Sequence, residues 1–150
     1  MAQYMIAREG VTPTAGDMLL SLTTGLQEIA KVNEIGVGGE ATSSTVNRMA
    51  VRRSTTNLVT PTAQTPAKAS STSPAAYTDA ATTAGTQPVT AAAPAIWTYA
   101  LNVFGGLLRW VAAPGQELII QGATAGNNEL SLESAAGAGI ISTQIVFEEV

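Results

Sequence analysis

An alternation of apolar and polar residues near the C-terminal end of the sequence is the feature that most restricts the fold. In "IISTQIVFE", Ile141, Ile145 and Phe147 fall on one face, and Gln144 and Glu148 fall on the other. A period of two residues is that of a β-strand, because successive side chains point to opposite sides of the backbone. A strand with one polar face belongs to an antiparallel sheet that packs on one side only. The sequence therefore predicts antiparallel β-structure.

Further strand signals follow one another at close spacing. They occur in "NRMAVRRS", "IWTYALNVF", "LLRWV", "ELIIQG" and "GNNELSLES". We expect Met49 and Val51 to face inward, with Arg48 and Arg52 outward. Short strands separated by turn residues predict an all-β protein, an antiparallel β-sandwich or jelly roll of about eight strands.

The alternation also predicts which side chains form the core. In "IWTYALNVF" the aromatic and aliphatic residues Trp97, Tyr99, Leu101 and Val103 share one face. For the C-terminal part, we expect a core that includes Trp110, Leu118, Ile120, Leu130, Leu132, Ile141, Ile145 and Phe147.

A proline–glycine corner separates two of these apolar segments. In "RWVAAPGQELIIQG", Pro114 sets φ for the first corner position and Gly115 tolerates a positive φ at the second. This is the signature of a type II turn. We interpret the corner as a hairpin connection between the flanking strands.

The first third of the chain permits two interpretations. In "MLLSLTTGLQEIAKV", Leu19, Leu22, Leu26 and Ile29 recur at helical spacing, whereas Gly25 and the preceding threonines favour extended structure. The pattern favours strand-turn-strand over a helix without excluding the helix.

Residues 54–95 have a composition that cannot build a core. Of these 42 residues, 32 are Ala, Thr, Ser or Pro, and Lys68 and Asp79 are the only charged residues. The five prolines disfavour helix. We expect one β-domain spanning residues 1–150, with residues 54–95 as a long inserted loop containing little regular structure. That loop is either disordered or ordered by contact with a partner.

Composition argues against several classes of function. The chain has no cysteine and no histidine, so we expect no disulfide, no metal site, no cofactor and no enzymatic activity. A net charge of -4 gives no basic surface for nucleic acid. The sequence has neither a long apolar run nor a signal-peptide pattern, which predicts synthesis in a cytoplasm and no contact with a membrane. Only 12% of residues are charged, which indicates a surface that largely faces other proteins.

Several residues could carry chemistry, and each also has a plainer interpretation. Arg48, Arg52 and Arg53 could contact an anion or a partner, although an outward strand face explains most of them. The remaining candidates are aromatic, acidic or glycine-rich. Trp97, Tyr99 and Trp110 could stack on a sugar but fit a core better; Glu129 with Glu133, and Glu148 with Glu149, fit a solvated face better than an acid pair or a calcium site; and "GVGGE" at 36–40 fits a loop after a strand better than a phosphate cradle.

Three stretches resemble a family of small tailed-bacteriophage virion proteins, the head decoration or cement proteins. They are "AKVNEIGVGGEAT", "NRMAVRRSTT" and "RWVAAPGQELIIQGATAGNNELSLESAAGAGIISTQIVFEE". The Thr-, Ala- and Pro-rich middle segment lies where the family carries a variable loop, but it lacks the acidic Asp-Pro repeats often found there. The resemblance implies a jelly-roll or β-sandwich fold and favours strands in the first third.

The resemblance also implies a function. A protein of this family binds the major capsid protein on the outer surface of the virion, associates with its own copies as a dimer or trimer, and stabilises the capsid lattice. The alternatives are a tail or fibre domain that binds a host receptor or glycan, and a stand-alone carbohydrate-binding module. The candidate partner contacts are Arg52, Arg53, Pro61, Pro66, Tyr77 and Pro88.

Overall fold

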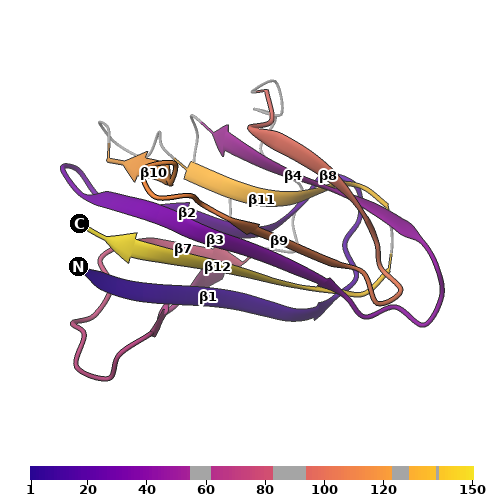
Figure 1. Cartoon of the computed structure of the whole chain (residues 1–150), viewed down its shortest axis with the longest axis horizontal. Helices are drawn as coiled ribbons and strands as arrows, with labels where there is room; N and C mark the ends of the chain where they lie inside the picture. Colours follow the sequence, from indigo (N-terminus) through magenta and orange to yellow (C-terminus); the bar gives the residue numbers. More distant parts are fainter. Residues whose placement is uncertain (55–61, 83–93, 123–128, 138) are drawn as a thin grey trace.

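The computed structural model describes residues 1–54, 62–82, 94–122, 129–137 and 139–150. Within these residues the chain forms twelve β-strands and no helix. All the strand pairs are antiparallel, and they build two six-stranded sheets that pack on each other as a sandwich (Figure 1). The all-β sandwich predicted from the alternation is confirmed, with more strands than the eight or so expected.

The two sheets contain segments from the whole length of the chain. Sheet A has the order β10-β3-β12-β1-β6, with β9 also paired to β3; it comprises β1 (Ala2–Val11), β3 (Ile29–Gly39), β6 (Ala67–Lys68), β9 (Leu107–Val111), β10 (Leu118–Gln121) and β12 (Ile141–Glu149). Sheet B has the order β5-β7-β2-β11-β4-β8; it comprises β2 (Asp17–Thr23), β4 (Val46–Ser54), β5 (Thr62–Gln64), β7 (Asp79–Thr82), β8 (Trp97–Asn102) and β11 (Glu129–Ala136).

Strand β12, whose alternation of apolar and polar residues predicted antiparallel β-structure, lies in the middle of sheet A. It pairs with β1 on one side, from Ala2 opposite Glu149, and with β3 on the other. Both ends of the described chain therefore lie at the same end of the sandwich (Figure 1). Phe147 is fully buried and stacks on Tyr4 of the neighbouring strand, with ring centroids 5.7 Å apart.

The core between the sheets contains most of the predicted residues. Those predicted correctly are Ile120, Leu130, Leu132, Ile141, Ile145 and Phe147, together with Met49, Val51, Leu101 and Val103. Trp110, Leu118 and Trp97 are only half-buried and pack against the edge of the core. Tyr99 lies on the same face of β8 as the buried Leu101, as predicted, but its side chain is 48% exposed because β8 is at the edge of sheet B.

Residues 17–39 form a strand, a turn and a strand, as the extended interpretation predicted. The helical interpretation is wrong, since β2 ends at Thr23 and the turn carries Gln27 with a φ of +69°. Leu26 lies in this turn and is 67% exposed, so its helical spacing with Leu22 is incidental. The glycines of "GVGGE" belong to β3 rather than to a loop, which corrects the expectation for residues 36–39.

The Pro114–Gly115 corner is a type II turn but not a hairpin connection. Gln116 N donates to Ala113 O at 2.8 Å, and Gly115 has a φ of +80°. Strands β9 and β10 do not pair with each other, because both pair with β3: β9 with residues 34–38 and β10 with residues 29–32. The two strands thus form one edge of sheet A, and the turn interrupts that edge.

The Ala-, Thr- and Pro-rich segment contains more regular structure than its composition indicated. Its described residues include β5 and β7, which extend sheet B beside β2, and β6, which pairs with β1 at the edge of sheet A. The segment therefore adds edge strands to both sheets. Small side chains suffice there, since Ala80 and Ala81 of β7 are the only buried residues of these three strands.

The chain's two phenylalanines offer a matched test of the core. Replacing Phe147 with alanine should lower the free energy of unfolding by about 3–5 kcal/mol, because the ring leaves a cavity against Tyr4. Phe104 is 59% exposed, and Phe104→Ala should change that free energy by less than about 0.5 kcal/mol. Urea unfolding of both variants measures the difference, and equal losses would contradict the described packing.

Candidate partner-binding surface

Large apolar side chains are exposed along the outer face of strands β9 and β10. The exposed fractions are 74% for Leu107, 54% for Val111 and 46% for Ile119. The alternate residues Leu108 and Ile120 are buried in the core, so the strand period itself directs the exposed ones outward. We call Leu107, Arg109, Val111 and Ile119 the β9–β10 strip.

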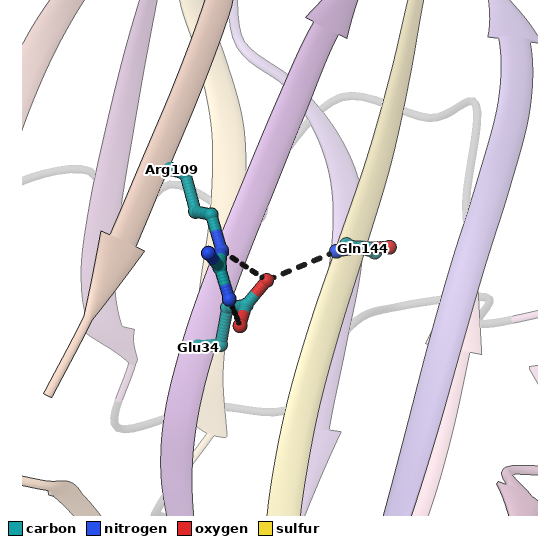
Figure 2. Close-up of polar contacts among 3 residues, drawn as sticks. All are labelled: Glu34, Arg109 and Gln144. Carbon is teal, nitrogen blue, oxygen red and sulfur yellow. Dashed lines mark hydrogen bonds and ion pairs between the residues drawn. The ribbon is translucent and has the colours of Figure 1, made fainter.

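The one charged residue of this strip is neutralised by a neighbour on β3. The Arg109 guanidinium donates from Nε to Glu34 Oε1 at 2.9 Å and from Nη2 to Glu34 Oε2 at 2.7 Å. Gln144 on β12 donates from Nε2 to Glu34 Oε1 at 3.2 Å, and Figure 2 shows the three side chains spanning three strands. Two parallel hydrogen bonds fix the guanidinium in the plane of the carboxylate. The strip therefore presents an ion pair with no excess charge.

The same contacts shift the pKa values of both partners. The hydrogen bonds from Arg109 lower the pKa of Glu34 below its ordinary value of 4.5. The hydrogen bonds to Glu34 in turn raise the pKa of Arg109. The Arg109 side chain is 61% exposed and that of Glu34 17%, so the pair lies at the surface, where its contribution to stability is small and is screened by salt.

A second group of exposed apolar residues lies at the end of the sandwich far from the termini. Backbone hydrogen bonds close this end: Gly39 N donates to Gly106 O, Glu40 N to Ile140 O, and Ala41 N to Val103 O. The exposed residues of this end, which we call the sandwich tip, are Val46 (62%), Phe104 (59%) and Ile140 (39%). Leu107 follows Phe104 after two glycines, so the β9–β10 strip begins three residues after the tip residue Phe104 along the chain.

A shallow hollow of about 250 Å³ lies on the outer face of sheet A beside the strip. Gly36 and Gly38 of β3 form its floor, and Gln144 and Leu107 are among the residues that line it. A Cβ built on Gly36 would lie 2.9 Å from Gln144 Cγ. The absent side chain therefore lets Gln144 lie over β3 and reach Glu34.

The residues predicted to contact a partner do not form one surface. Arg53 is exposed on β4, whereas Arg52 is half-buried and forms an ion pair with Glu133 of β11. Pro66 and Tyr77 are half-buried near β5 and β7, which β2 and β11 separate from β4. Pro61 and Pro88 lie outside the described residues.

Tyr77 fastens its segment to the C-terminal strand. Its hydroxyl donates to Ile29 O at 2.8 Å, and Val150 N donates to that hydroxyl at 3.1 Å. The backbone N–H groups of Tyr77 and Thr78 donate to Glu149 Oε1 at 2.9 and 2.7 Å. Burial raises the pKa of Tyr77, so its hydroxyl stays protonated and able to donate at neutral pH. These contacts are internal to the chain.

The expectation of solvated carboxylates is wrong for three glutamates. Glu129 and Glu133 on β11 are 3% and 4% exposed, and Glu149 is 6% exposed. Each has a partner: Glu133 binds Arg52, Glu149 accepts two backbone N–H groups, and Glu129 also has a polar interaction. Paired in this way, a buried carboxylate avoids most of its desolvation penalty. The sequence analysis missed these residues, since alternation cannot show that both faces of β11 are covered.

A second hollow, of about 500 Å³, lies around β5, β7 and the end of β2. Among its polar lining residues, Thr78 Oγ1 and Gln64 Oε1 have no hydrogen-bond partner. Strand alternation places Gln64 on the face of sheet B toward the core and Ser21 and Glu129 on the opposite face. The polar groups therefore do not converge on one reacting point. Within the ranges the structure describes, no three Asp or Glu side chains gather closely enough to hold a metal ion.

Comparisons with protein families, with curated proteins and with solved structures find no match to this chain. Within the described residues, no helix has the length and the hydropathy that crossing a membrane requires.

The Glu34–Arg109 contact predicts a measurable shift in acid titration. In Arg109→Gln the pKa of Glu34 should rise back toward 4.5, whereas Arg53→Gln on sheet B should leave it unchanged. Because the folded-state pKa is the lower one, the pair contributes stability above about pH 4.5 and loses it as the pH falls through the folded value. A carbon-detected NMR titration of the side-chain carboxyl measures the pKa, and no rise in Arg109→Gln would contradict the assigned contact.

Substitutions of Glu149 and of the adjacent Glu148 test whether Glu149 holds the backbone of Tyr77 in place. Glu149→Gln weakens two charge-assisted hydrogen bonds and should lower the free energy of unfolding by about 1–3 kcal/mol. The amide protons of Tyr77 and Thr78 should also exchange faster. Glu148→Gln, on the outer face of the same strand, is the control and should leave both quantities nearly unchanged. Equal effects of the two substitutions in urea unfolding and hydrogen exchange would refute the role of Glu149.

Proposed function

We propose that this chain is a structural virion protein of a tailed bacteriophage, a head decoration or cement protein of the jelly-roll type. It binds the major capsid protein on the outer surface of the capsid, associates with its own copies and stabilises the lattice without catalysis. The observation that carries the proposal is the exposed apolar surface formed by the β9–β10 strip and the sandwich tip. The resemblance of about half of the chain to this family gives it a biological setting.

The make-up of this surface suits binding to a protein. Leu107, Phe104 and Val46 are each more than half exposed, and burying them against a partner releases water from a large apolar area. The one ion pair on the strip is internally neutral, so covering that pair leaves neither of its two charges without a partner. Contacts of this kind, repeated by the symmetry of a capsid, bind by avidity and need no single strong site.

The arrangement of the aromatic residues supports a protein partner over a sugar. Trp97 and Trp110 are both half-buried and pack against the core, on sheet B and sheet A respectively. Tyr99, at 48%, is the most exposed of the candidate stacking residues. These side chains therefore offer no shared platform on which a sugar ring would stack.

Two exposed leucines at opposite ends of β3 give a matched test of the proposed surface. Leu107 lies at the β3 end that carries the tip, opposite Gly38, and Leu26 lies in the turn before β3. Leu107→Lys should reduce binding to capsids of the cognate phage at least tenfold, since a charge must be buried against the partner. Leu26→Lys should bind as the unmodified chain does. Equal binding by both variants in a capsid co-sedimentation assay would show that the strip does not contact the capsid.

A salt and heating series tests the function itself. If apolar contacts dominate, the protein should stay on emptied capsids at high salt, because salt screens exposed ion pairs and leaves hydrophobic burial intact. Capsids carrying the protein should resist heating better than capsids without it. Equal heat resistance would contradict the cement role. Specific binding to a cell-surface glycan would instead indicate a receptor-binding tail or fibre domain.

A further inference from the structure

Strand β8 lies at the edge of sheet B. It lacks the charged residues and prolines that usually prevent a sheet edge from pairing with another chain. Residues 93–108, which include β8, contain no charged residue, and β8 itself contains no proline. Among the described strands it pairs only with β4, and no described strand pairs with the backbone groups on its other side. Long uncharged edges readily pair with another strand.

The other described edges carry the protection that β8 lacks. Strands β5 and β6 have three and two residues, and β6 includes Lys68. The edge formed by β9 and β10 is broken by the Pro114–Gly115 turn and carries Arg109. Strand β8, with six residues, is an unbroken edge that carries no charged residue.

The register of β8 defines which of its groups are available. Val103 N donates to Thr45 O at 3.0 Å, in line with the β4–β8 register. In an antiparallel ladder alternate residues bond to the same neighbour. Thr98 and Ala100 therefore direct their N–H and C=O groups away from β4, and the side chains of both are exposed.

We propose that β8 is a self-association edge, at which β8 of a second copy of this chain pairs antiparallel about a two-fold axis at Tyr99. A two-fold axis perpendicular to the sheet must place residues of the same face opposite each other. An axis at Tyr99 does so, because it sets Tyr99 against Tyr99 and Thr98 against Ala100. The exchange is reciprocal, as a two-fold interface requires.

The side chains and charges at this edge favour a second copy. Tyr99 is 48% exposed, and in a pair without direct hydrogen bonds the opposing side chains are close, so the two rings contact each other. The charged residue nearest along the ladder is Arg48, opposite Ala100 on β4. In the pair of copies the two Arg48 residues are three strand spacings apart, about 14 Å, which exceeds the screening length at physiological salt. Repulsion between the two Arg48 side chains therefore opposes the pairing little.

Because the chain has no cysteine, disulfide trapping tests this register directly. In Tyr99→Cys the two introduced thiols lie opposite each other, with Cα atoms about 4.5 Å apart, within reach of a disulfide. In Ala100→Cys, equally exposed on the same strand, they are two residues out of register and about 8 Å apart, beyond that reach. Oxidation of the isolated proteins should give at least tenfold more covalent dimer for Tyr99→Cys. Equal dimer yields, or none from either variant, would overturn the proposal.

A second measurement uses the chain without cysteines. Sedimentation of the unmodified chain should show a concentration-dependent dimer, and Tyr99→Lys should abolish it because two like charges then meet at the axis. Leu26→Lys, at another exposed apolar position, should still dimerise. A monomer at every concentration, or a dimer that persists in Tyr99→Lys, would contradict the proposal that β8 is the self-association edge. Since no capsid is present, these results are independent of the proposed decoration role.

Discussion

The insertion of β12 between β1 and β3 is the constraint on which the rest of the structure depends. It makes the polar-apolar strand near the end of the sequence the centre of sheet A, and it places Phe147 against Tyr4 in the core. The edge strands β9 and β10 then have only β3 to pair with. Glu149 at the end of β12 holds the backbone of Tyr77 and Thr78, so β12 also anchors part of the segment that composition marks as a loop.

The fold class and much of the core could be predicted because both depend on local alternation. Ile141, Ile145 and Phe147 repeat every second or fourth residue, and a period of two leaves little choice of structure. Pairing partners depend on distant residues. The Pro114–Gly115 turn has the conformation that its residues dictate, yet turn chemistry does not say whether the flanking strands pair with each other or with β3.

The candidate surface was hidden from sequence analysis for a related reason. In "LLRWV" an inward Trp110 places Leu108 inward and Leu107 outward, but alternation cannot say whether another part of the chain covers the outward leucine. The same ambiguity affected β11, where Glu129 and Glu133 share a face that alternation marks as solvated and the structure covers. Arg52 is half-buried because Glu133 lies beside it, a contact between strands far apart in sequence. Neither contact leaves a local signature.

The central position of β12 has a consequence for synthesis. Among the described strands β12 is made last, so on the ribosome β1 and β3 emerge before the strand that joins them. Until then their backbone groups and the apolar faces that carry Tyr4 and Ile35 are uncovered. Long-range pairing of this kind is slow and leaves strand edges open to other chains. The nascent chain should therefore need a chaperone, or dilution from its neighbours, for longer than a protein whose strands pair in order of synthesis.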